Sequence, residues 1–132
     1  MSAFTNDGEN LLLNWMFNTS SVTRPTAWYV AIHTGDPGET GASNEVLVAS
    51  DADYVRQAVT MGTSTTGTSA STSQVVHTPA VAAGTYSVTH ASIWTASTAG
   101  TCLIKGALAA SRSISNASPL TFEIGEIIAA LD

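Results

Sequence analysis

The sequence predicts a mainly β fold, an antiparallel sandwich or partly closed barrel of about seven or eight short strands with one N-terminal α-helix. Short runs that alternate apolar and polar residues recur at intervals near ten residues. Glycine, proline and asparagine separate these runs, as expected of turns between antiparallel strands. Helical spacing of apolar residues is confined to the first 18 residues.

The length of 132 residues fits a single domain over residues 1–132. We expect a helix over about 7–18, a β-domain over about 27–132 and a flexible, Ser/Thr-rich loop at 62–73. That loop, GTSTTGTSASTS, has no charge and no large side chain. It cannot bury enough apolar surface to offset its ordering entropy, which predicts a mobile loop or a hairpin tip.

The predicted helix has Asn6 or Asp7 as its N-cap and Glu9 in its first turn. Its apolar residues surround most of the helix axis, and they are Leu11, Leu12, Leu13, Trp15, Met16 and Phe17. A helix that is apolar nearly all round needs cover on several sides. Two interpretations remain open, in which the helix covers an open end or face of the β-structure, or part of it docks on another subunit.

The stretch WYVAIHTGDPGETG at 28–41 predicts a strand over 27–34 followed by a tight acidic loop. Trp28, Val30 and Ile32 alternate with three other residues, so both faces of the strand carry bulk and are expected to be covered. Pro37 fixes φ, and Asp36 can bond its own backbone in the turn. The loop is therefore predicted to be a rigid corner at the rim of the fold.

The remaining strands are predicted from alternation and bounding turn residues, with inward-facing Leu120, Phe122 and Ile124 in the penultimate one. The strand candidates are 45–49, 54–61, 74–81, 85–96, 101–109, 111–115 and 120–124. The run EIIAALD after Gly125 is a last strand or a turn of helix, and its Ile pair favours the strand.

Composition excludes several classes of function. The net charge is −6 and the four basic residues are scattered, so no basic stripe is available to neutralise phosphates and no nucleic acid is expected. A single cysteine, Cys102, cannot form an internal disulfide, and its apolar neighbours predict a buried thiol. The sequence shows no signal peptide and no apolar run that spans a membrane, so we expect a protein made in a cytoplasm.

Candidate chemical groups are few. His33, His77 and His90 have no metal-ligand spacing on one element, although His33 and His90 could meet across strands. The acids that could bind calcium, from the 36–39 loop and at Glu45, Asp51 and Asp53, do not match an EF-hand. Cys102 with His90 lacks an orienting third group. We therefore expect no catalytic residue, no cofactor and no metal, and hence no enzyme.

Several motifs in order resemble a family of small tailed-bacteriophage virion proteins. They are YVAIHTGDPGETG at 29–41, NEV at 44–46, YVRQAV at 54–59, VTHASIW at 88–94, LIKGAL at 103–108, then Phe122, Gly125 and LD at 131–132. The likeness covers about residues 28–132 and does not include the 62–73 loop. Members are often labelled tail-fibre-like, and similar small phage β-proteins decorate capsids, so the resemblance implies a structural virion component.

Within that implication we expect a capsid decoration (cement) protein, because the chain is short and has neither fibrous repeats nor coiled-coil heptads. The alternative is a tail-fibre or tail-tip module that contacts the host surface. The expected partners are the major capsid protein or tail proteins and further copies of the chain, with a trimer favoured. The candidate subunit contacts are Leu12, Trp15, Met16, Asp36, Pro37 and Glu39.

Overall fold

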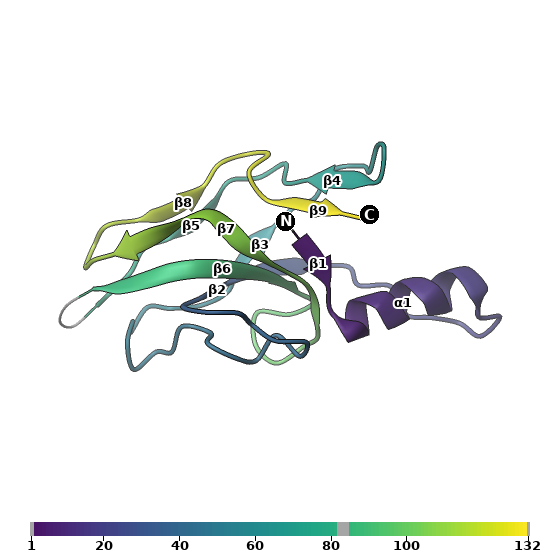
Figure 1. Ribbon diagram of the computed structural model, residues 1–132, viewed down its shortest axis with the longest axis horizontal. Helices are drawn as coiled ribbons and strands as arrows, with labels where there is room; N and C mark the ends of the chain where they lie inside the picture. Colours follow the sequence, from purple (N-terminus) through teal and green to yellow (C-terminus); the bar gives the residue numbers. More distant parts are fainter. Residues whose placement is uncertain (1, 82–84, 132) are drawn as a thin grey trace.

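A computed structural model describes residues 2–81 and 85–131 of the protein. The described residues form one helix and nine strands (Figure 1). In chain order these are β1 (Ser2–Phe4), α1 (Asn6–Phe17), β2 (Trp28–His33), β3 (Gln57–Val59), β4 (Thr68–Ala70), β5 (Val75–His77), β6 (Tyr86–Trp94), β7 (Cys102–Ile114), β8 (Leu120–Phe122) and β9 (Ile128–Ala130). No helix in the described part of the chain is long and apolar enough to cross a membrane.

The strands form one large sheet and two small ones. The large sheet has five strands in the order β1-β7-β6-β2-β3, and the small sheets are the pairs β4-β9 and β5-β8. Every strand pair is antiparallel. The two small sheets lie over one face of the large sheet (Figure 1). The molecule is therefore mainly β and sandwich-like, without a closed barrel, and the fold class predicted from the sequence is confirmed.

Burial on both faces of β2 explains its central place. Val30 and Ile32 belong to the main core, which fills the space between the large sheet and the β5-β8 pair. Ala31, on the opposite face, packs with Trp94 and Cys102 in a second, smaller cluster. The prediction that this strand is covered on both sides holds for residues 30–33, all of which are buried.

β7 joins two predicted strands, 101–109 and 111–115, into one. Its pairing with β6 shifts register between Val88 and His90, where residues 108–111 bulge out. On its other side, β1 pairs only with residues 104–106 of β7. Among the described strands, none pairs with this outer edge beyond Gly106. This leaves an open strand edge, a feature that proteins usually cover or protect with charge.

The start of α1 is fixed by Thr5 rather than by Asn6 or Asp7. The Thr5 hydroxyl accepts the Gly8 N–H and donates to the Cys102 carbonyl at 2.6 Å, while its own N–H donates to the Leu103 carbonyl. Thr5 can cap the helix and join it to β7 at once because it follows β1 directly. The prediction of Asn6 or Asp7 as the N-cap was wrong, because the sequence pattern did not indicate the short strand β1 before the helix.

Past its first half, α1 does not cover the β-structure. Gly8 is its only buried residue, and Leu11 and Leu12 are half-buried. The helix projects from one end of the sandwich (Figure 1). The interpretation in which the helix covers an open end or face of the β-structure is therefore wrong for its second half, where the large apolar side chains are exposed.

Other differences from the predicted strands have local causes. Residues 62–73 contain β4, and Thr66 and Gly67 with positive φ form a hairpin tip there; the mobility of the segment stays a prediction. The predicted 45–49 strand is reduced to one bridge between Glu45 and His33. Ile124 is exposed rather than buried, because β8 ends at Phe122 and the chain turns at Gly125.

Replacing Gly8 with alanine should detach α1 from β7. A Cβ at this position would overlap the Leu103 carbonyl oxygen, which is backbone and cannot move aside. The helix propensity gain of about 1 kcal/mol should be outweighed, so thermal unfolding should begin at lower temperature. Asn10→Ala, at an exposed position of the same helix, is the control and should be neutral or slightly stabilising. An unchanged melting temperature for Gly8→Ala would contradict this account of the helix attachment.

Candidate interaction surface

The acidic loop at 34–44 is attached to its own sheet. Lys105 on β7 lies 3.2 Å from an Asp36 carboxylate oxygen and 3.0 Å from one of Glu39. Asp36 also accepts the Gly38 N–H at 2.7 Å, and this bond and then Lys105 lower the pKa of its carboxyl group. Pro37 is fully buried, so it stiffens the loop from inside. The predicted corner is present and is packed against β7, and its rigidity stays a prediction.

The loop closes against the smaller cluster at Gly41. A Cβ here would overlap both Cys102 and the Trp94 ring, and its φ of 72° lies in the left-handed region. Only glycine permits both the conformation and the close approach. This gives the GETG end of the motif a packing role.

Glu45 and Arg56 form a two-point ion pair beneath this loop. The Arg56 Nε and Nη2 groups each donate to a different Glu45 oxygen at 2.8 Å, and the Tyr54 hydroxyl donates to Glu45 Oε1 at 2.8 Å. Burial raises the pKa of Glu45, but the hydrogen bonds from Arg56 and Tyr54 outweigh burial and the net pKa is lowered. The carboxylate is thus ionised and held by three donors.

Arg56 also stacks on Trp94. Its guanidinium carbon lies 3.5 Å from the ring centroid, and Nη1 donates to the carbonyls of Ala96 and Ala99 in the β6–β7 connection. A planar guanidinium can pair, stack and bond carbonyls at once, which a lysine cannot. Arg56 therefore ties three segments together, namely the chain before β3, the Glu45 loop and the β6–β7 turn.

A second buried chain of hydrogen bonds runs through His33. Its Nδ1 lies 2.9 Å from the Ser43 carbonyl, and its Nε2 lies 2.7 Å from the Ser92 hydroxyl, which accepts the Trp94 indole N–H. A carbonyl only accepts, so Nδ1 carries the proton and Nε2 accepts from Ser92. Burial lowers the pKa of His33, consistent with this neutral form.

The side chains considered as candidate chemical groups make hydrogen bonds within the fold. His33 and His90 are directly opposite in the β2–β6 register, as their spacing allowed, but His90 bonds Thr89. Burial raises the pKa of Cys102 to about 11, and its thiol points at the Ile104 carbonyl. Asp51 is buried and accepts the Ala80 N–H and the Tyr86 hydroxyl. Across residues 2–81 and 85–131, no group of three His, Cys, Asp or Glu side chains could hold a metal ion.

The exposed end of α1 is an apolar surface, which we call the α1 tip. It consists of Leu13, Trp15, Met16 and Phe17, which are 54%, 64%, 61% and 75% exposed. Leu13, Met16 and Phe17 are spaced i, i+3, i+4 and share one face, while Trp15 lies on another. Two of the predicted contact residues, Trp15 and Met16, belong to the tip, whereas Leu12 is half-buried beside it.

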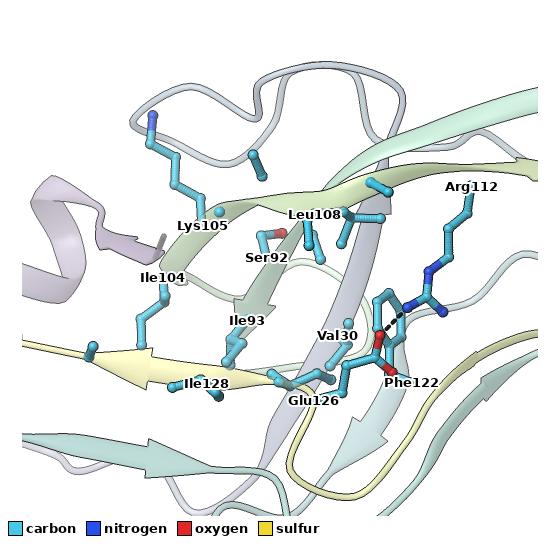
Figure 2. A pocket seen from close by; sticks show the side chains of 17 residues that line it. Val30, Ser92, Ile93, Ile104, Lys105, Leu108, Arg112, Phe122, Glu126 and Ile128 are labelled. Atoms are coloured by element: carbon cyan, nitrogen blue, oxygen red, sulfur yellow. Dashed lines mark hydrogen bonds and ion pairs between the residues drawn. The ribbon is translucent and has the colours of Figure 1, made fainter.

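A groove of about 510 Å³ opens between β7 and β9 (Figure 2). Ile104 and Leu108 on β7 face Ile128 on β9, and the floor reaches Val30 and Ile93 of the core. At one end Arg112 pairs with Glu126 and donates to the Thr121 carbonyl. We call this feature the β7–β9 groove. It lies beside the strand edge that β1 leaves open.

Sequence reasoning missed this groove and half of the tip. Leu13 and Phe17 were visible as an i, i+4 pair, and their exposure could have been suspected from the number of apolar residues around one short helix. The groove lies where β1 ends along β7. A strand of three residues is too short to show an alternation pattern, so the sequence did not indicate where this pairing ends. Contacts to another subunit by any of the six predicted residues stay a prediction.

Trp94 is buried as expected from its strand, with 5% of its surface exposed. Replacing it with alanine should cost about 3–5 kcal/mol of unfolding free energy. The loss includes the support for Arg56, so Arg56→Ala in the Trp94→Ala background should cost less than in the wild type. Chemical denaturation of the four proteins measures this coupling, and strict additivity would show that the stack contributes nothing.

His77 should make the protein sensitive to acid. It is buried, its Nε2 has no hydrogen-bond partner among the described residues, and burial lowers its pKa to about 4. The unfolded chain takes up this proton near pH 6.5, so the contribution of neutral His77 is full above that pH. It decreases by up to about 3 kcal/mol as the pH falls towards 4.

His77→Phe keeps the ring that stacks on Tyr54 and removes the unpaired nitrogen. We expect its melting temperature to change less than that of the wild type between pH 6.5 and 4. Asn10→Ala, which changes no titratable group, is the control and should retain the wild-type slope. Parallel pH profiles for wild type and His77→Phe would contradict the assignment.

A family model described as Podophage GP4 fiber I protein gp80 matches residues 3–130. No curated protein matches the chain. The matched range includes α1 with its exposed tip, both strands that flank the groove, and the motifs that form the Glu45–Arg56 and His33–Ser92 contacts. The match extends over nearly the whole chain, and the protein belongs to this family of tailed-phage virion proteins.

Proposed function

We propose that the chain is a non-enzymatic structural component of a podophage fibre and joins other virion proteins through the α1 tip. The observation that carries this proposal is the exposure of four large apolar side chains on a helix that projects from the β-body. An exposed apolar helix face such as that of Leu13, Met16 and Phe17 marks an interaction site, because water contact with it is unfavourable.

The form of the tip suits docking into a concave partner. An amphipathic helix that enters a groove is recognised through anchors spaced i, i+3, i+4, which is the spacing of Leu13, Met16 and Phe17. Tryptophan and phenylalanine are large rigid anchors that lose little conformational freedom on binding. The acidic loop contributes less to this proposal, because Asp36 and Glu39 already pair with Lys105.

The fibre assignment differs from the capsid decoration expected from the sequence. That expectation rests on the short length and the lack of fibrous repeats, which concern architecture alone. The family description names a fiber protein, and this supports the fibre assignment. The structural role is supported further by the reactive groups, since Cys102, His33 and Asp51 are all buried in hydrogen-bonded positions.

Immunogold labelling and reconstruction of the intact particle test the location. We expect the protein on the tail fibres, at a few copies for each fibre. A regular array of many copies on the head would overturn the fibre assignment and support decoration.

A phage that carries Met16→Asp and Phe17→Asp together tests the role of the tip. We expect particles that lack the protein, although the purified variant remains folded, since both side chains are exposed. Val48→Asp removes an equally exposed apolar side chain from a different surface and should leave incorporation unchanged. Normal incorporation of the double variant would exclude the tip as the attachment surface.

A further inference from the structure

We propose that the α1 tip of one copy docks in the β7–β9 groove of a second copy, so that the chain assembles head to tail. The inference builds on the proposed function, because it identifies another copy of the chain as the partner that covers the tip. It rests on two features of one molecule, the α1 tip and the β7–β9 groove, each of which leaves apolar side chains exposed in the isolated chain.

The groove has the character of an acceptor for apolar side chains. Its walls are Ile104 and Leu108 on one side and Ile128 on the other, and Ile128 is 52% exposed in the isolated chain (Figure 2). Its floor is core, since Val30 is fully buried beneath it. A volume of about 510 Å³ lies within the usual range of roughly 300–1,000 Å³ for pockets that enclose a ligand. An anchor placed here would extend the existing core.

The area available at the tip fits a stable contact. A buried aromatic side chain covers about 150–250 Å², and Trp15 and Phe17 are 64% and 75% exposed. Their exposed parts therefore supply roughly 200–350 Å², and Leu13 and Met16 add comparable aliphatic surface. A lasting interface buries about 800 Å² on each partner. The tip thus supplies a large part of one side, and the groove walls and rim supply the other.

The polar ends of the two surfaces also match. The last carbonyls of a helix lack intrahelical partners and carry partial negative charge, and α1 has no basic residue in its last turn. Arg112 stands at one end of the groove with its side chain 36% exposed. Of its five N–H donors, Nη1 and Nη2 use one each on described partners, Thr121 and Glu126. The remaining donors suit the carbonyls at the end of an incoming helix.

The donor and acceptor surfaces lie on different parts of the chain. α1 leaves the body at Thr5 and points away from it, so its tip is presented outward while the groove lies between β7 and β9 (Figure 1). Contact between two different patches is heterologous, and each copy can donate and accept at once. Such contacts close into rings, of which a trimer is one, or continue as filaments.

Sedimentation and light scattering of the purified protein test the assembly. We expect the wild type to form oligomers larger than dimers as concentration rises. The donor variant, Met16→Asp with Phe17→Asp, and the acceptor variant, Ile128→Asp, should each be folded by circular dichroism and monomeric by sedimentation and light scattering. Val48→Asp, outside both surfaces, should assemble as the wild type does.

Mixing the two variants separates head-to-tail docking from the other arrangements. The donor variant keeps an intact groove and the acceptor variant keeps an intact tip, so an equimolar mixture should form one-to-one dimers and nothing larger. Assembly of Ile128→Asp alone would indicate a tip-to-tip contact and overturn the proposal. A mixture that stays monomeric would do the same.

Failure of docking between copies can be distinguished from failure of the proposed function. A wild type that is monomeric at every concentration, but lies on the fibre in labelled particles, would refute docking between copies and leave the fibre assignment standing. Tip-to-groove assembly of a protein found on the capsid would support docking between copies and refute the fibre assignment.

Discussion

The Glu45–Arg56 ion pair, in which Arg56 also stacks on Trp94, is the contact on which the β2–β3 connection and the β6–β7 turn depend. The long connection from β2 to β3 has little regular structure, so few backbone ladders hold it. Arg56 replaces them by bonding Glu45 on that connection and two carbonyls of the β6–β7 turn. Because both charges are largely removed from water, loss of either partner would leave the other uncompensated, which is far more destabilising than loss of a surface pair.

The same region explains why the recognisable motifs are structural. NEV contributes Glu45, YVRQAV contributes Tyr54 and Arg56, and VTHASIW contributes Ser92 and Trp94. In three dimensions these separate motifs form one network beneath the acidic loop. Their residue types follow from burial of polar groups, each of which needs a partner of fixed geometry. The surfaces that face outward, the α1 tip and the β7–β9 groove, lie apart from this network.

Much of the fold could be predicted from local pattern, and the failures share a cause. The β2 and β6 strands and the helix follow from alternation and apolar spacing, which are properties of contiguous residues. β1 and the Thr5 cap depend on pairing between residues about 100 positions apart, and the single long β7 depends on its pairing with β6 from Trp94↔Cys102 to Tyr86↔Ile114; local pattern encodes neither. For the candidate surface, the apolar character of α1 was visible and exposure of part of the helix could be suspected, but which of its residues are exposed depends on how Thr5 and Gly8 attach it to β7. The groove was invisible because it is defined by where a partner strand ends.

Because α1 is attached near its start, a small tilt at the attachment produces a larger displacement at the tip. Its first half is fixed to β7 at Thr5 and Gly8, and its tip lies about 14 Å further along the axis at a rise of 1.5 Å per residue. A tilt of about 10° at the attachment therefore moves the tip by about 2–3 Å. In the proposed docking between copies, successive subunits would bend or twist relative to one another while the contact at the tip stays the same. A single interface of this proposed kind would serve positions of unequal curvature in an assembly.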